Sequence, residues 1–345
     1  MSPSETEKNK KVPYESELRQ DIVTGDFVVI ATGRAKRPDE FVAFQRSAPD
    51  YTNDPFESPE ESGQEKDVLI YRQDNGDWSL RVFPNKYPAF SRGRAARELS
   101  EGPYFSMTGA GYNEIVVTRD KRRSLALLEV WQGAEVFDAY QERYLALMNK
   151  KSVNYIQIFH NHGKEAGASI AHPHSQLMAI PVVSPYIDLE LKGAERYYRS
   201  TKRTVYGVMA EYESESKKRI VFENEHFIAF CPFASRVAFE VWIVGKRANP
   251  YFERIIDEEK FAAAEAMQKA LFAIYQGLND PPYNFYIHTA PCDGKDYPHY
   301  QWHIEILPHT AVWAGFELST GIEISTIQPE KAAEYLRLQL DQPLR

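Results

Sequence analysis

Cysteines and long apolar runs are scarce in this 345-residue chain. The two cysteines, Cys231 and Cys292, form neither a Cys-x-x-Cys motif nor a disulfide framework, so we expect a reducing, cytoplasmic location. No apolar run approaches the roughly 20 residues of a membrane helix. Residues 1–11 are polar and lack the apolar core of an export signal. We therefore expect neither export nor membrane insertion.

An excess of basic residues is also absent, because 49 acidic residues outnumber 41 lysines and arginines. The net charge of −8 leaves no basic footprint for nucleic acid, although a local arginine cluster could still bind a nucleotide. The length is sufficient for two modest domains or one fused core. These properties indicate an enzyme or binding protein for small molecules, with no nucleic-acid or membrane partner.

Residues 172–176 read His-Pro-His-Ser-Gln and carry most of the chemical information. If they form a strand, His172, His174 and Gln176 share one face. An imidazole can attack phosphorus at neutral pH to form a phosphoramidate, and a nearby amide can donate hydrogen bonds to the phosphoryl oxygens. The motif predicts a covalent nucleotidyl-histidine. A zinc or iron chelate and a purely structural pair of histidines are the alternatives.

The preceding segment favours phosphate chemistry. Residues 153–159 read as a buried strand, and residues 161–169 form a loop rich in small side chains that ends at Ser169. Such a loop brings backbone N–H groups and a hydroxyl close to a phosphate. The loop alone is weak evidence, because it is also an ordinary connection between two strands. Together with the histidine motif it is a much stronger signal.

The second half of the chain repeats the first. Aligning Pro181 with Pro308 matches His172 with His299, His174 with Gln301 and Gln176 with His303. The surrounding expected elements also correspond: strands 113–119 and 239–245, strands 153–159 and 283–289, and helices 128–150 and 257–278. We therefore expect an α+β fold of two half-barrel units, each an antiparallel sheet with one long crossover helix. Their expected extents are 1–195, with the nucleophile, and 196–345.

These motifs resemble the galactose-1-phosphate uridylyltransferase branch of the histidine-triad superfamily, whose hallmark is His-Pro-His-x-Gln. The similarity extends from Arg-Ala-Lys-Arg-Pro at 34–38 to Gly-Phe-Glu at 315–317. Residues 279–284 and 315–321 are also similar to plant ADP-glucose phosphorylase, a relative in the same branch. The resemblance implies two histidine-triad-like units, a homodimer and ping-pong transfer of a nucleotide from UDP-glucose to a hexose 1-phosphate.

The resemblance also implies roles for individual residues. His174 is the implied nucleophile, and Gln176 holds the oxygens of the transferred phosphate. Phe316 and Glu317 lie at the sugar, contributed by the second half or by a partner subunit. The implied substrate-binding residues are Arg34, Arg37, Asn85, Asn161, Ser169, Phe316 and Glu317. The chemistry itself requires no cofactor.

Two metal sites follow from the same resemblance. The family's zinc-binding Cys-Pro-Phe-Cys loop reads Asp-Pro-Phe-Glu here, with Asp54 and Glu57 in place of the thiolates and Asn113 at a later ligand position. Zinc prefers thiolate and imidazole, so we expect this site to be lost and replaced by hydrogen bonds or an arginine ion pair. A second site, for iron or zinc, falls on Glu190, His288, His303 and Glu305. The alternative there is a buried His–Glu hydrogen-bond network.

Residues 311–314 lack the lysine that uridylyltransferases carry shortly before Gly315, which bears on the identity of the acceptor. If the acceptor is inorganic phosphate and the base adenine, the chain is an ADP-sugar phosphorylase. Outside the family, it could be a metal-dependent oxidase or hydrolase that uses His172 and His174 as ligands. A catalytically silent nucleotide-binding protein is the remaining alternative.

Overall fold

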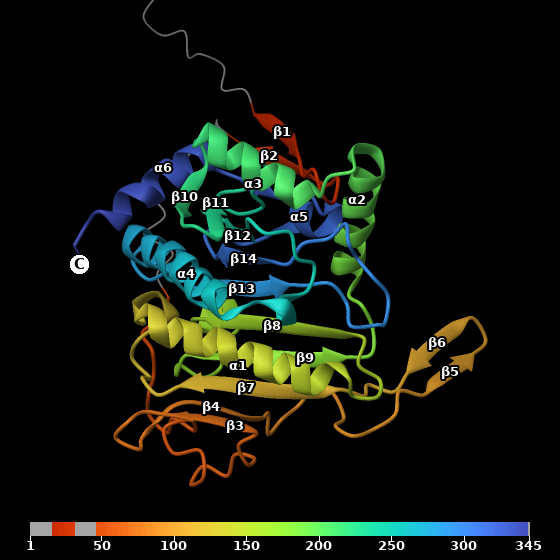
Figure 1. The fold of residues 1–345 in the computed structure, drawn as a ribbon, viewed down its shortest axis with the longest axis vertical. Helices are drawn as coiled ribbons and strands as arrows, with labels where there is room; N and C mark the ends of the chain where they lie inside the picture. The colour runs from red at the N-terminus through yellow and green to blue at the C-terminus, as the bar shows by residue number, and fades with distance from the viewer. Residues whose placement is uncertain (1–15, 32–45, 344–345) are drawn as a thin grey trace, which may run out of the picture.

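The computed structural model describes residues 16–31 and 46–343 (Figure 1). At its centre is a ten-stranded sheet in which all neighbouring strands are antiparallel. Its order is β10 (Ile220–Glu223), β11 (Phe227–Phe230), β12 (Val241–Gly245), β14 (His303–Pro308), β13 (Tyr283–His288), β8 (Tyr155–His162), β9 (His174–Ile180), β7 (Tyr112–Thr118), β4 (Trp78–Pro84) and β3 (Leu69–Arg72). The fold is therefore of the α+β class, as the sequence predicts. Strands that the repeat matched occupy mirrored places about the central β8–β13 pair.

Six α-helices and two small sheets complete the described ranges. The helices are α1 (Val130–Met148), α2 (Pro185–Thr201), α3 (Val205–Ser216), α4 (Asp257–Leu278), α5 (Gly315–Thr320) and α6 (Pro329–Leu340). The small sheets join β1 (Glu17–Gln20), β2 (Phe27–Ile30) and β15 (Ile324–Ser325), and β5 (Glu98–Glu101) with β6 (Tyr104–Met107). Within the described ranges, every helix is too short or too polar to cross a membrane.

Helices α1 and α4 lie side by side over one face of the large sheet (Figure 1). Both were expected from their periodic apolar positions, and Phe137, Tyr140 and Tyr144 of α1 are buried. Where the helices cross, a Cβ on Gly133 would lie 3.1 Å from the Cβ of Ala264. Small residues thus let the two helices approach closely, and the main core forms between them and the sheet.

The opposite face of the sheet is more polar. Residues of β9 and β14 alternate between the two faces, so that Leu177 and Ile304 join the core beneath the helices. His174 and His303 point to the other side. Helices α2 and α3 pack over the second-half strands on that side, and Tyr206 of α3 lies against the ring of His303 with 4.7 Å between centroids.

The repeat alignment that matched His174 with Gln301 is wrong by two residues. His174 and His303 are the first residues of β9 and β14, whereas Gln301 precedes β14. In both histidines Nδ1 hydrogen-bonds the carbonyl two residues earlier, at 2.8 Å to His172 and 3.1 Å to Gln301. The alignment failed for two reasons, each worth one residue: β14 is one residue shorter than β9, and Pro308 is the last residue of β14 whereas Pro181 follows the end of β9. The second half therefore has an imidazole at the matching place.

Candidate active site

His174 lies where β9 begins, with only 8% of its surface exposed. Phe56 packs edge-on against its ring, with 5.2 Å between centroids. The next residue, Ser175, faces the helix layer, where its hydroxyl accepts a 2.5 Å hydrogen bond from Tyr140 and lies 3.1 Å from Nδ1 of His160. These contacts fix β9 on the face of the sheet that the helices cover. They present His174 and Gln176 together on the opposite face, as the period of two predicts.

The hydrogen bonding of His174 leaves one nitrogen available for attack. Its Nδ1 is 2.8 Å from the carbonyl oxygen of His172, and a carbonyl only accepts, so Nδ1 carries the proton. Nε2 therefore holds a lone pair, and it has no hydrogen bond to any residue in the described ranges. Burial lowers the pKa of His174 and outweighs the opposing effect of the His172 carbonyl. The ring is thus a neutral imidazole, which is the form that attacks phosphorus.

This lowered pKa predicts the pH dependence of turnover. The neutral imidazole is the reactive form, and it persists as the pH falls until the pKa of His174 is reached. We expect the acidic limb of kcat/KM to lie below pH 6.5, the ordinary histidine value, with little change between neutral and mildly alkaline pH. A limb centred at or above pH 6.5 would contradict the buried, neutral imidazole. The measurement is kcat/KM across the pH range in buffers of constant ionic strength.

Gln176 is oriented by a residue whose role the sequence did not reveal. Asn113 of β7 donates from Nδ2 to Oε1 of Gln176 at 3.3 Å, which leaves the Gln176 amide hydrogens for a ligand. The backbone N–H of Asn85 in turn donates to the carbonyl of Asn113 at 2.9 Å. Asn85, which was expected in the nucleoside pocket, is thus linked to Gln176 through Asn113.

A cavity of about 490 Å³ opens beside His172, and both Asn161 and Ser169 line it. The loop between β8 and β9 forms one wall and turns at Gly163 and Gly167, whose φ angles of 85° and 92° favour glycine. Ser169 is exposed to the cavity. The structure thus brings the two expected phosphate contacts together near the histidine motif.

Asn161 depends on residues from the other half of the chain. Asn284 of β13 donates from Nδ2 to Oδ1 of Asn161 at 2.8 Å, and Nε2 of His309 lies 2.6 Å from Oδ1 of Asn284. The Nδ2 group of Asn161 is left to donate to a ligand. Sequence reasoning did not assign Asn284 or His309 a role. The polar residue at an alternate position of the expected strand 283–289 was the available signal.

The other expected substrate contacts within the described residues, Asn85, Phe316 and Glu317, do not line this cavity. Arg34 and Arg37 lie outside the described residues. Phe316 and Glu317 belong to the short helix α5 and do not line the cavity, and Phe316 is 49% exposed. Oε2 of Glu317 accepts a 3.1 Å hydrogen bond from the backbone of Ala314, which starts that helix.

The residues at the expected zinc position form separate pairs. Nδ1 of His172 lies 2.8 Å from Oδ2 of Asp54, and its Nε2 lies 2.7 Å from the carbonyl oxygen of Thr118. Glu57 instead pairs with Lys121 at 2.7 Å and with Arg119 at 3.3 Å. Hydrogen bonds and ion pairs thus connect the strands and the loop here.

The assignment of Asn113 to that position is wrong. His172 contacts β7 at Thr118, whereas Asn113 lies near the other end of the strand, roughly 17 Å away at about 3.4 Å per residue. Its side chain is bonded to Gln176. The cations that face Glu57 come instead from the segment after β7.

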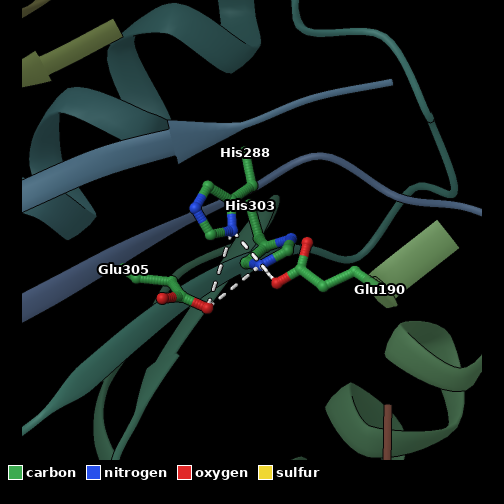
Figure 2. Close-up of side chains that lie close together, drawn as sticks. All are labelled: Glu190, His288, His303 and Glu305. Carbon is green, nitrogen blue, oxygen red and sulfur yellow. Dashed lines mark hydrogen bonds and ion pairs between the residues drawn. The ribbon is translucent and has the colours of Figure 1, made fainter. Parts of the chain in front are cut away.

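The four residues of the second expected metal site lie close together, as the family resemblance implies. Figure 2 shows Glu190 of α2, His288 of β13, and His303 and Glu305 of β14 converging in the buried second half. Nδ1 of His288 lies 3.1 Å from Oε1 of Glu190 and 3.7 Å from Oε1 of Glu305. Nε2 of His303 lies 3.8 and 3.5 Å from the same two oxygens.

These separations suit a tetrahedral metal ion. Bonds of about 2.0–2.2 Å place the corners of a tetrahedron about 3.3–3.6 Å apart. Nε2 of His303 and Oε1 of Glu305 are buried without a hydrogen-bond partner, which a ligated metal would relieve. Tyr300 donates to the other oxygen of Glu190 at 2.5 Å, and Arg236 pairs with the other oxygen of Glu305. In each carboxylate, one oxygen thus bonds to a residue outside the cluster and the other oxygen faces the cluster.

The charge of Glu305 also suits a cation, whereas burial of His288 is outweighed by the two carboxylates, which raise the pKa of His288, so a metal ion would have to displace a proton from that ring. Burial opposes ionisation of Glu305, but Arg236 and His288 outweigh it and hold the pKa of Glu305 below its usual range. Glu305 is therefore an anion at neutral pH, available as a ligand.

The site suits an enzyme that transfers nucleotidyl groups through a covalent intermediate. It combines a neutral, buried imidazole that has a free nitrogen with amide donors and a loop of small residues. The similarity to known proteins supports the same class of enzyme. A family model described as "Galactose-1-phosphate uridyl transferase, N-terminal domain" matches residues 5–184, and one described as "Domain of unknown function (DUF4921)" matches residues 136–343.

Individual relatives cover nearly the whole chain. An ADP-glucose phosphorylase of Arabidopsis thaliana is 33% identical, covering 93% of this chain and 92% of the relative. A galactose-1-phosphate uridylyltransferase of Thermotoga maritima is 30% identical, over 93% and 98%. The crystal structure of an Arabidopsis ADP-glucose phosphorylase with bound ADP-glucose has a TM-score of 0.79 at 30% identity, over 94% and 99%. The chain belongs to the galactose-1-phosphate uridylyltransferase family of nucleotidyltransferases.

Proposed function

We propose that this protein transfers uridylyl groups from UDP-glucose to a hexose 1-phosphate by ping-pong chemistry. Nε2 of His174 attacks the α-phosphorus, the N–P bond forms, and glucose 1-phosphate leaves with the electron pair of the broken P–O bond. A phosphate oxygen of the acceptor then attacks the same phosphorus and releases the imidazole. The observation that carries this proposal is the orientation of His174, with Nδ1 held by a carbonyl and Nε2 free.

The surrounding residues position the phosphates. Gln176, Asn161 and Ser169 donate hydrogen bonds to phosphoryl oxygens as charge shifts between them. The leaving group and the acceptor are already anionic phosphates, so no strong general base is needed. Asn85, with Arg34 and Arg37, binds the nucleotide in this scheme.

The second candidate is an ADP-glucose phosphorylase, which transfers an adenylyl group to inorganic phosphate. It is favoured by the similarity to the Arabidopsis enzyme and by the lack of a lysine in residues 311–314. A small acceptor would need no lysine to hold a sugar phosphate. The covalent step at His174 is the same in both candidates, so the donor base and the acceptor distinguish them.

Incubation with UDP-glucose and with ADP-glucose separately, followed by intact-mass measurement, tests both candidates. We expect one uridylyl adduct per chain from UDP-glucose, mapped to the peptide that contains His174 and lost in mild acid, because an N–P bond is acid-labile. An adenylyl adduct formed only from ADP-glucose would favour the phosphorylase. An adduct on His299 or His303, or one stable to acid, would contradict the assignment of His174.

A metal-dependent oxidase or hydrolase at the motif is disfavoured, because both ring nitrogens of His172 are already hydrogen-bonded. We propose instead that Glu190, His288, His303 and Glu305 hold zinc or iron, with a role in binding α2 to the sheet, and that the former zinc position needs no metal. Two carboxylates and two imidazoles form a donor set that both metals accept.

We further propose that the chain comprises two histidine-triad-like half-barrel units, 1–195 and 196–345, and functions as a cytoplasmic homodimer. The mirrored strand order supports the two units, and the free cysteines fit a reducing compartment. Phe316 and Glu317 contact the sugar from the partner's side in this arrangement. Their exposed position in α5, away from the cavity of their own chain, is the supporting observation.

A further inference from the structure

The hairpin of β5 and β6 forms an arm that projects from the body of the protein (Figure 1). Its two strands pair only with each other, and every residue except Met107 is exposed. Leu99, Tyr104 and Phe105 are 65%, 75% and 62% exposed. An isolated two-stranded hairpin is marginally stable in water unless another strand or layer packs against it. The arm therefore requires a partner that the single chain does not provide within the described residues.

The outer edge of β5 offers a row of unpaired backbone groups. The N–H of Thr108 donates to the carbonyl of Arg97 at 2.9 Å, so Arg97 directs its backbone toward β6. Because this direction alternates along a strand, Leu99 and Glu101 also face β6, whereas Glu98 and Ser100 face outward. An exposed edge of this kind is a template for pairing with another strand.

The sequence of β5 is complementary to itself in the antiparallel direction. Residues 97–101 read Arg-Glu-Leu-Ser-Glu. When two copies align about Leu99, Glu98 lies opposite Ser100, and these are the residues whose backbone groups face outward to exchange hydrogen bonds. Arg97 lies opposite Glu101 at both ends, and the two Leu99 side chains meet at the centre. The outward-facing backbone groups, the opposite charges and the apolar contact thus all favour the same register.

We propose that the arms of two copies of this chain pair edge to edge across a two-fold axis, β5 against β5, in the register centred on Leu99. An isologous contact of this kind is self-limiting and produces a closed dimer. The outer edge of β6 is the weaker candidate, because Tyr104–Met107 carries no charged residue to set a register. The proposal specifies an interface of the homodimer proposed above and does not depend on the nucleotidyl chemistry.

Cysteine cross-linking tests the register. Residues opposite each other in a non-hydrogen-bonded antiparallel pair have Cα atoms about 4.5 Å apart, which a disulfide can span. We expect Leu99→Cys to form a disulfide-linked dimer under mild oxidation. Ser100→Cys is the matched control, because the two copies of residue 100 lie about 8 Å apart in this register, beyond disulfide reach. Equal cross-linking of both variants, or none in Leu99→Cys, would overturn the proposal.

Charge reversal gives a second, independent reading in the full-length protein. Arg97→Glu or Glu101→Arg places like charges opposite each other twice, and we expect each to weaken the dimer by about tenfold in sedimentation. The double variant Arg97→Glu with Glu101→Arg restores both pairs and should recover the affinity. Unchanged dissociation constants in the single variants, or no recovery in the double variant, would overturn the register. Labelling of His174 in the same variants reports separately on the proposed function.

Discussion

His174→Gly should reduce turnover by about 10⁴-fold or more while nucleotide-sugar binding stays within about tenfold of the original. The substitution removes the proposed nucleophile, whereas Gln176 and Asn161, which are proposed to hold the phosphates, keep their own partners. The loss should therefore fall on kcat. Steady-state kinetics with each donor sugar and calorimetric titration of the nucleotide measure the two quantities.

His299→Gly is the matched control for this experiment. His299 lies shortly before β14, in the second half of the chain, and is partly exposed. We expect full turnover and normal labelling in that variant. If His174→Gly retained more than a few per cent of the activity, or if His299→Gly lost it, the covalent mechanism at His174 would be excluded.

We expect the original protein to carry about one zinc or iron per chain at the proposed site, and Glu190→Gln to lose most of it. The substitution preserves size but replaces an anionic oxygen ligand with a neutral amide, while His288, His303 and Glu305 remain. We expect metal content to fall at least about tenfold and the gain in Tm on adding zinc to disappear, because a ligand that binds only the folded state stabilises it. Elemental analysis and thermal unfolding provide readouts that do not depend on activity.

Glu57→Gln makes the same chemical change at the other acidic cluster. Glu57 faces Lys121 and Arg119, so we expect unchanged metal content there and only a small loss of stability, consistent with its partly exposed ion pairs. Loss of metal from Glu57→Gln would show that the carboxylates replace the family's thiolates after all. Absence of metal from the original protein under metal-replete conditions would favour the His–Glu hydrogen-bond network.

Periodicity made much of the site predictable. The period of two placed His174 and Gln176 on one face, and the helical period identified α1 and α4 within a few residues. The metal cluster required residues from three separate elements, and the family resemblance supplied them where no local pattern could. The resemblance did not extend to Asn113, because an amide that orients Gln176 and an amide that replaces a metal ligand look identical in sequence.

Register was harder to predict because it depends on where each strand begins. A shift of two residues keeps every side chain on the same face, so the alignment of Gln301 with His174 was as consistent with the pattern as the correct match to His303. The hydrogen bonds of the two imidazoles distinguish them. Contacts between the halves, such as that of Asn284 with Asn161, depend on strand pairing across 123 positions of sequence and leave no local trace.

The contact between Asn284 and Asn161 makes the proposed site in one half of the chain depend on the other half. The bond from Asn284 to Asn161 joins β13 to β8, so the orientation of a proposed phosphate donor is set by a residue from the opposite half. Neither half expressed alone would keep Asn161 oriented, and substitutions on one side of the seam are constrained by the other. We therefore expect that separately produced fragments regain labelling at His174 only when they reassociate. The proposed site thus depends on strand pairing between the two halves of the chain.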